Sequence, residues 1–212
     1  MSETRAQFSH LVTIYLPIAG VVFGIVVVAL AVVVVRFRYR SGRSVSRRSE
    51  ANRLELAYVL ILAVVVGVLV TVTFRSESQV DAVAASPALR ITAIGADWRW
   101  RFEYPGLGID QVGQGQTPTA LYVPAGRTIE FDLTSLDVIH AFDVPDEDFQ
   151  RAAIPKIVNR FDLVFPTPGI EPGECNEYCG IGHTLMRFEV HVLSADQFAT
   201  WVSERRQQEG GR

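Results

Sequence analysis

The sequence has 212 residues, of which 49% are hydrophobic and 20% are charged, and its formal net charge is −3 at pH 7. This composition excludes a disordered or collagen-like chain. The two cysteines are too few for a disulfide-rich scaffold, and without a CxxCH motif the chain has no covalent attachment site for a c-type haem.

The charges are distributed unevenly along the chain. Seven arginines lie between residues 36 and 53, against a single acidic residue, Glu50. Residues 76–212 carry 20 acidic and 11 basic side chains, a net charge of −9. Nucleic-acid-binding domains usually present a basic face, so the charge argues against nucleic acid and favours a basic protein partner.

Two uncharged apolar stretches predict membrane-spanning helices. Leu11–Val35 has 25 residues and Leu56–Phe74 has 19, and a spanning helix needs roughly 20. A cleaved signal peptide is the alternative for the first stretch and a buried core helix for the second. However, the first is too long and is followed by arginine, and the second is uniformly apolar. We therefore predict a transmembrane hairpin over residues 1–75.

The arginines predict the orientation of this hairpin. Arginine-rich loops stay in the cytoplasm, so residues 36–53 are expected there. Both termini and the domain at 76–212 are then expected on the periplasmic, extracytoplasmic side of the cell membrane. Glu55, at the cytoplasmic start of the second span, either reaches the interface by snorkelling or has a function within the membrane.

From Ala88 onward, apolar and polar residues alternate, which is typical of half-buried β-strands. The alternation is clear at 98–104, 129–133 and 188–192, and Pro- and Gly-containing turns separate these segments. The pattern predicts a β-sandwich or a Greek-key barrel. Near the end, Ser194 and Gln197 form a capping-box pattern, and Phe198 and Trp201 begin an apolar face, so a short terminal helix is expected.

The clearest chemical signal is a set of four potential metal ligands within twelve residues: Cys175, Cys179, His183 and Met186. Thiolate and thioether ligands favour copper over a hard cation. A mononuclear blue-copper site would use one cysteine, two histidines and a methionine, which leaves Cys175 without a role. Two thiolates four residues apart can instead bridge two copper ions.

Other interpretations of the cysteines remain open. They can form a disulfide in an oxidising compartment, bind zinc together with two histidines, or act as a copper chaperone, although such chaperones usually have a thioredoxin-like fold. A disulfide or a zinc site leaves Met186 without a role. A second histidine ligand must come from elsewhere in the chain. His10 lies at the membrane edge and His191 faces away from the predicted core, whereas His140 ends a predicted strand and can face the cysteine loop.

These residues together resemble subunit 2 of the haem-copper cytochrome c oxidases. The resemblance is carried by the motif Cys175-x-Glu177-x-Cys179-x-x-x-His183-x-x-Met186 and by His140, 35 residues upstream in a Val-Ile-His-Ala-Phe context. It extends over nearly the whole chain. The hairpin, the aromatic stretch at 98–104 and the Ala153-Ile-Pro155 segment also belong to it.

The resemblance implies a cupredoxin-like domain with a binuclear Cu-A centre. One copper ion would be held by His140 and Met186 and the other by His183 and the carbonyl of Glu177. Cys175 and Cys179 would bridge both ions. The Glu177 carboxylate would be free to reach a Mg or Mn ion shared with subunit 1, a sensible ligand for such a cation.

The resemblance also implies a function, that of the electron-entry subunit of a terminal respiratory oxidase. Cytochrome c, or a small copper protein, would dock at Trp98 and deliver single electrons, which pass to a haem in subunit 1. There oxygen is reduced to water and protons are pumped. Glu55 resembles the family glutamate at the entrance of a proton path, and other oxidase subunits are expected partners.

Two residues depart from the family pattern, because Ala152 and Lys156 stand where many members have Asp and Gly. The departures weaken the expected subunit contact near the Mg site. Related classes fit less well: a quinol oxidase subunit normally lacks the copper ligands, and the propeller of nitrous oxide reductase is not present in this sequence. A copper-delivery protein does not need Trp98, and a purely structural membrane subunit does not need the ligand loop.

Overall fold

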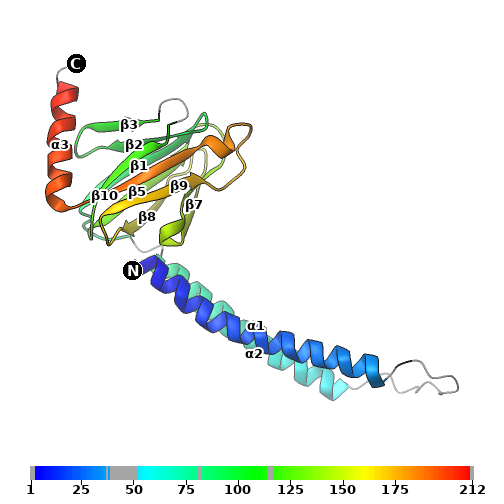
Figure 1. Ribbon diagram of the computed structural model, residues 1–212. Coiled ribbons are helices and arrows are strands. Elements are labelled where there is room, and N and C mark those ends of the chain that lie inside the picture. The colour runs from blue at the N-terminus through cyan, green and yellow to red at the C-terminus, as the bar shows by residue number, and fades with distance from the viewer. Residues whose placement is uncertain (1–2, 37, 39–51, 81–82, 114–116, 211–212) are drawn as a thin grey trace. The chain divides into compact units, whose positions relative to one another are not determined.

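The computed structural model describes residues 3–36, 38, 52–80, 83–113 and 117–210 (Figure 1). Two long apolar helices precede a β-sandwich, which a third helix follows, and this order confirms the predicted fold class. The chain divides into two compact units, one formed by the helices at Ser9–Glu77 and the other comprising Ser78–Arg212 with the first eight residues. Most of the predicted arginine-rich loop, residues 37 and 39–51, lies outside the described residues.

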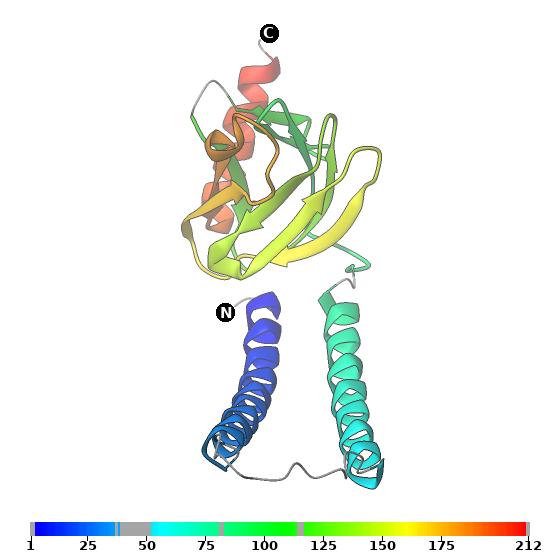
Figure 2. The same ribbon diagram turned by 90° about the vertical axis from the view of Figure 1, so that its right-hand side faces the viewer.

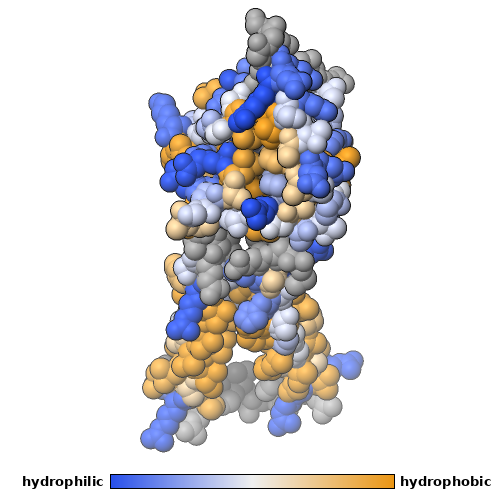
Figure 3. All heavy atoms as spheres, turned by 90° about the vertical axis from the view of Figure 1, so that its left-hand side faces the viewer, coloured by the Kyte–Doolittle hydropathy of each residue, from blue (hydrophilic) through white to orange (hydrophobic). Residues whose placement is uncertain are grey.

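The first unit contains helices α1 (Glu3–Arg36) and α2 (Asn52–Val80), which run antiparallel (Figure 2). They include two candidate membrane spans, Arg5–Arg36 and Asn52–Ser78, with mean hydropathies of 3.2 and 2.8. Apolar side chains cover the faces of both helices seen in Figure 3. Helix α2 continues beyond the predicted end of the apolar stretch at Phe74, because backbone hydrogen bonding does not require apolar side chains.

Several polar side chains in the described part of this unit are paired within the protein. The Tyr15 hydroxyl of α1 donates a hydrogen bond to the Leu69 carbonyl of α2 at 3.1 Å and also contacts the Thr73 hydroxyl. Thr71 and Thr73 donate to carbonyls four residues earlier, at 2.7 and 2.9 Å. Such internal pairing is what a hydrocarbon environment requires, since it offers no water to polar groups.

The second unit is a sandwich of two five-stranded sheets (Figure 1). The first sheet has the order β3 (Ile109–Val112), β2 (Arg99–Tyr104), β1 (Leu89–Ala96), β5 (Thr128–Ser135), β8 (Asn159–Val164). The second has the order β4 (Thr119–Pro124), β10 (Arg187–Leu193), β9 (Gly169–Cys175), β6 (His140–Val144), β7 (Phe149–Ala153). Pairs β1–β5 and β4–β10 are parallel, and the other pairs are antiparallel.

Aromatic side chains from both sheets fill the core between them. The rings of Phe142 and Phe188 stack with centroids 4.7 Å apart, and the Trp100 ring meets each of them edge-on at 5.7 Å. Burying a large apolar side chain contributes about 1.5–3 kcal/mol. Phe188 lies opposite Gly173 in the β9–β10 register, where a Cβ would be 2.2 Å from its ring, so the core needs glycine there.

The predicted alternation is confirmed in β10, where Phe188, Val190 and Val192 are buried and His191 faces outward. The aromatic stretch at 98–104 differs from the prediction at its first residue. Strand β2 begins at Arg99, and Trp98 lies in the two-residue turn after β1. Both turn residues have positive φ angles, 50° at Asp97 and 55° at Trp98, so the Trp98 side chain leaves the strand face.

Helix α3 (Ala195–Gly210) confirms the predicted capping box and apolar face. The Ser194 N–H donates to the Gln197 side-chain oxygen at 3.0 Å, and the Gln197 N–H donates to Ser194 Oγ at 3.3 Å. The Trp201 ring stacks on Tyr122 of β4 with centroids 4.7 Å apart. This contact joins α3 to the second sheet. Two short 3-10 helices complete the unit, at Pro145–Glu147 (η1) and His183–Leu185 (η2).

Candidate metal centre

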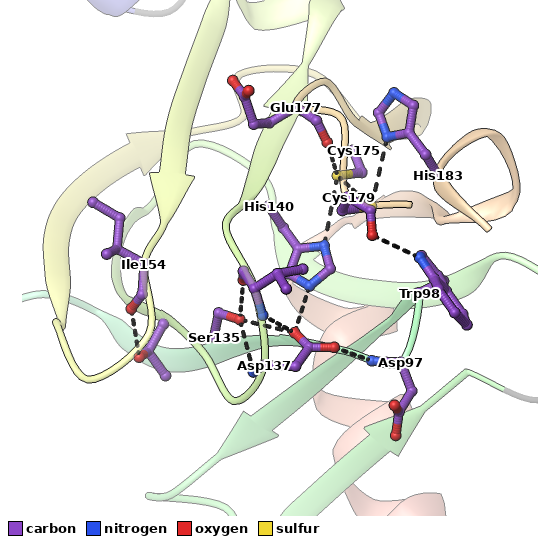
Figure 4. Close-up of polar contacts among 12 residues, drawn as sticks. Asp97, Trp98, Ser135, Asp137, His140, Ile154, Cys175, Glu177, Cys179 and His183 are labelled. Atoms are coloured by element: carbon purple, nitrogen blue, oxygen red, sulfur yellow. Dashed lines mark hydrogen bonds and ion pairs between the residues drawn. The ribbon is translucent and has the colours of Figure 1, made fainter. Parts of the chain in front are cut away.

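Two segments far apart in the sequence meet at one end of the second sheet. Cys175 is the last residue of β9, and the loop after it leads through η2 to Met186, whose carbonyl accepts the Cys175 N–H at 3.0 Å. Strand β6 pairs with β9 so that Phe142 is opposite Cys175. His140, at the start of β6, is therefore beside the first cysteine (Figure 4).

Four potential ligand atoms form a series of close contacts. The distance from His140 Nδ1 to Cys175 Sγ is 3.8 Å, from there to Cys179 Sγ 3.8 Å, and from Cys179 Sγ to His183 Nδ1 3.6 Å. Both cysteines are free thiols. Ligand atoms of His140, Cys175 and Cys179 all lie within 4.8 Å of one another, so this group can hold a metal ion.

The sulfur separation fits metal coordination. With metal–sulfur bonds of about 2.3 Å and a tetrahedral angle, two thiolates on one metal ion are about 3.8 Å apart. The Sγ atoms of Cys175 and Cys179 have this separation, 3.8 Å. The carbonyl of Glu177 is 3.4 Å from Cys175 Sγ and adds an oxygen to the same group of atoms. Soft sulfur ligands next to imidazoles are a typical copper environment.

The protonation states of the thiols also favour a bound cation. Burial raises the pKa of Cys175, but hydrogen bonds from His140 and the backbone outweigh it and lower this pKa to about 6. Burial and the negative charge of Cys175 raise the pKa of Cys179. Two adjacent thiolates therefore repel each other, and a metal ion supplies the positive charge that allows both to ionise.

The side chains of Met186 and His140 both lie against Gly95, which leaves room for them. The Met186 side chain is only 1% exposed. A Cβ at Gly95 of β1 would be 2.8 Å from His140 Cδ2 and 3.3 Å from Met186 Cε. The absence of a side chain at Gly95 thus allows the ring and the thioether to pack against the first sheet.

Trp98 lies at the surface beside the cysteine loop. Its indole N–H donates a hydrogen bond to the Cys179 carbonyl at 2.9 Å, while 42% of the residue is exposed. A Cβ on Gly182 would be 2.5 Å from the indole, so the ring rests directly on this glycine. Trp98 is in this way both accessible at the surface and in contact with the backbone of a candidate ligand.

Two predicted site side chains, those of Glu177 and Glu55, do not join the cluster. The histidines that the sequence analysis did not favour as ligands, His191 and His10, also lie outside it. Glu177 is exposed, and its carboxylate points away from the cysteines in Figure 4. Glu55 is in the first turn of α2, in the other unit. His191 pairs with Glu189 at 3.2 Å, and His10 is an exposed residue of α1. The assigned roles of Trp98, Glu55 and the six ligand candidates stay predictions.

Asp137 is a residue of the site that the sequence reasoning missed. Its carboxylate accepts hydrogen bonds from His140 and from the Asp97 N–H, both at 2.8 Å. Burial raises the pKa of Asp137, but these and other hydrogen bonds outweigh it and lower the pKa to about 2. Its position three residues before a candidate ligand was the one available signal. That signal is weak, because acids are common in strand-connecting loops.

Residues 89–193 match the family model described as the periplasmic domain of cytochrome c oxidase subunit II. The chain is 31% identical over 140 residues to cytochrome c oxidase subunit 2 of Wickerhamomyces canadensis, covering 57% of each protein. It is equally similar, at 31% over 140 residues, to the same subunit of Saccharomyces cerevisiae, covering 57% of this chain and 56% of that one. The chain thus spans little more than half the length of these curated relatives.

Two solved structures are similar to the β-sandwich. The periplasmic domain of subunit II of cytochrome oxidase from Bradyrhizobium japonicum has 28% sequence identity and a TM-score of 0.53, covering 59% of this chain and 99% of that one. The second is a mixed disulfide intermediate between a thioredoxin-like protein and subunit II of cytochrome c oxidase. It has 27% identity and a TM-score of 0.51, covering 59% and 96%.

Proposed function

We propose that this chain is the electron-entry subunit of a terminal respiratory oxidase, because residues 89–193 match the family model of the cytochrome c oxidase subunit II periplasmic domain. The observation that carries the proposal is the cluster of His140, Cys175, Cys179 and His183, whose ligand atoms are in successive close contact. A proton-translocating oxidoreductase would use this chain for electron transfer only, since oxygen reduction belongs to the haem-bearing subunit 1.

In this proposal the site holds a binuclear Cu-A centre. Cys175 and Cys179 would bridge two copper ions, and His140, Met186, His183 and the Glu177 carbonyl would complete the ligand set. Bound by these residues, copper would supply one-electron redox chemistry. Burial of His140 and Met186 supports the same assignment, because ligands that are already packed need not reorganise.

The surface of the domain supports a basic electron donor such as cytochrome c. Residues 76–212 have a net charge of −9, and opposite charge accelerates association at low ionic strength. Trp98 would be the point of electron entry, because it is partly exposed and bonded to the Cys179 carbonyl. A small basic copper protein would satisfy the same requirements.

The Glu177 side chain would serve a second metal. Its exposed carboxylate is available for a Mg or Mn ion shared with subunit 1. The chain differs from the family pattern nearby, at Ala152 in β7 and at Lys156 in the following loop. Lys156 has a φ of 66°, a left-handed conformation that the family glycine adopts more easily.

The two apolar helices and the family of the β-domain together support a membrane protein. In the proposed orientation, both termini and the β-domain are periplasmic, and other oxidase subunits surround the helices. Glu55 would lie at the cytoplasmic end of α2, where a carboxylate can take part in proton uptake by subunit 1.

A thioredoxin-like protein is a further proposed partner, since a related subunit II forms a mixed disulfide with one. The free thiols of Cys175 and Cys179 are close enough to oxidise to a disulfide, which would leave no thiolate for copper. A thiolate of the partner would attack this disulfide and form a mixed disulfide. Its second thiol would then release the reduced pair, leaving the partner oxidised.

The proposal is tested on the full-length chain in detergent, reduced and loaded with copper. Metal content and the electron paramagnetic resonance spectrum are measured for the wild type and for Cys175→Ser, with His191→Gln as the control. We expect about two copper ions per chain, with the unpaired electron shared equally between them because two thiolates can bridge the ions. Cys175→Ser should lose this signal, and His191→Gln should keep it.

Two results would overturn the proposal. One copper ion with a localised signal would favour a copper-delivery protein. No bound copper after complete reduction of the thiols would favour a non-catalytic membrane subunit.

A further inference from the structure

Asp137 connects the candidate ligand His140 to the turn that carries Trp98 (Figure 4). Its Oδ1 is 2.8 Å from His140 Nε2, and its Oδ2 accepts the Asp97 N–H at 2.8 Å. The Val138 N–H also donates to Oδ1, at 2.7 Å. The carboxylate of Asp137, 40 residues after Asp97, thus joins the β1–β2 turn to the start of β6.

The contact with Asp137 determines which nitrogen of His140 is free to bind a metal. A carboxylate offers only acceptors, so His140 Nε2 must carry the hydrogen that is shared with Oδ1. In the neutral ring, the lone pair then lies on Nδ1, which faces Cys175 Sγ at 3.8 Å. The His140 ring is completely buried, so in this structure Asp137 and not solvent is the partner of Nε2.

These contacts form a closed ring around the site. Starting at Asp137, the path runs through the His140 ring to the two thiols and from the Cys179 carbonyl to the Trp98 indole. It returns through the Asp97 N–H to the carboxylate. We call this path the ligand ring; its members are Asp137, His140, Cys175, Cys179, Trp98 and Asp97.

The turn in the ligand ring adopts a conformation that needs support. Asp97 and Trp98 both have left-handed backbone angles, with φ values of 50° and 55°. Residues other than glycine adopt this region at a steric cost, although Asp tolerates it better than most. Two hydrogen bonds hold this turn, one from the Asp97 N–H to the Asp137 carboxylate and one from the Trp98 indole to the Cys179 carbonyl.

We propose that Asp137 is a positioning residue of the metal centre, which holds Nδ1 of His140 toward the thiols and ties the Trp98 turn to the same ligand. Its effect on copper rests on the proposed electron-entry function. Its effect on the His140 ring and on the Asp97 amide is a property of the metal-free chain. The two parts of the proposal can therefore fail separately.

The first test uses the metal-free, reduced full-length chain in detergent, with ¹⁵N-labelled histidine and backbone. In the wild type, we expect the His140 resonances of the tautomer protonated at Nε2, and slow hydrogen exchange at the Asp97 amide. Asp137→Ala should lose both features. In Asp137→Asn at least one of them should change, because one amide oxygen cannot serve both donors as the carboxylate does.

Asp132→Asn is the matched control. Asp132 lies on β5 and pairs with Arg160 at 2.8 Å, so its substitution removes one negative charge from the same domain away from the ligand ring. Both reporters should keep their wild-type values in this variant. A role of Asp137 in stability alone would lower the unfolding temperature and leave the His140 tautomer unchanged in the folded protein, which would overturn the proposal.

The second test loads the same variants with copper. Loss of a partner that orients a ligating histidine typically costs 10–100-fold in metal affinity. We expect a loss of roughly this size in Asp137→Ala, together with a shifted reduction potential, and neither change in Asp132→Asn. Unchanged affinity and potential would refute the effect on the metal. A wild type without the two-copper signal would refute the proposed function but leave the metal-free result valid.

Discussion

The contact between Trp98 and Gly182 allows the Trp98 side chain, the proposed point of electron entry, to be displaced by a substitution at another residue. A Cβ at Gly182 would lie 2.5 Å from Cγ, 2.7 Å from Cδ2 and 2.8 Å from Cβ of Trp98. Gly182 has φ −86° and ψ 5°, angles that alanine also adopts. Gly182→Ala therefore introduces a collision but no backbone strain, unlike a substitution at Gly180 with its φ of 116°.

The collision is large enough to displace the indole. Carbon atoms pack at about 3.5–4.0 Å, so the ring must retreat by about 1 Å or more from a distance of 2.5 Å. A shift of that size breaks the 2.9 Å hydrogen bond from Trp98 to the Cys179 carbonyl. With about 1 kcal/mol for the hydrogen bond and 1 kcal/mol or more for overpacking, we expect a loss of about 2 kcal/mol in the free energy of unfolding.

The assay compares Gly182→Ala with Gly169→Ala in the full-length chain. Gly169 begins β9 and has nothing within 4 Å of its Cβ position, which makes it the matched control. Chemical unfolding is followed by tryptophan fluorescence, because all three tryptophans lie in the β-domain. Reduction of the copper-loaded protein by cytochrome c is followed by stopped flow.

We expect Gly182→Ala to be less stable and to accept electrons more slowly, with its copper content unchanged. If it matches Gly169→Ala in both stability and reduction rate, Trp98 does not rest on the loop as described, and the reasoning is refuted.

Two further predictions concern residues outside the ligand ring. Lys156→Gly should raise the free energy of unfolding by about 0.5–1 kcal/mol, because glycine adopts the observed φ of 66° without steric cost; a lower stability in denaturant titration would contradict this. Burial and the nearby acids Glu147 and Asp146 raise the pKa of Glu171 to about 7 in the folded protein. The folded state therefore binds the proton of the Glu171 carboxyl more tightly than the unfolded state does. As the pH rises from about 4.5 to about 7, ionisation of Glu171 lowers the free energy of unfolding. Glu171→Gln should reduce this part of the pH dependence and be more stable than the wild type at pH 8, and equal slopes for both proteins would disprove the assignment.

The sequence by itself determined the features that depend on neighbouring residues. Uncharged apolar stretches predicted the two helices, because the length and hydropathy of a stretch are enough to identify such a helix. Alternation predicted the buried face of β10, and Ser194 with Gln197 predicted the start of α3. Both thiols, His183 and Met186 were recognisable because they lie in one short loop.

Only the tertiary structure decided the features that depend on segments distant in the chain. The pairing of β6 with β9 brings His140 to Cys175 across 35 residues. Packing between the sheets puts Gly95 against His140 and Met186. The alternation at 98–104 predicted Trp98 in a strand, but Trp98 lies in the β1–β2 turn. The contacts of Asp137 could not be predicted for the same reason: the parallel pairing of β1 with β5 places Gly95 opposite Ser135, and this pairing, between segments 40 residues apart, brings the Asp97 amide to the Asp137 carboxylate.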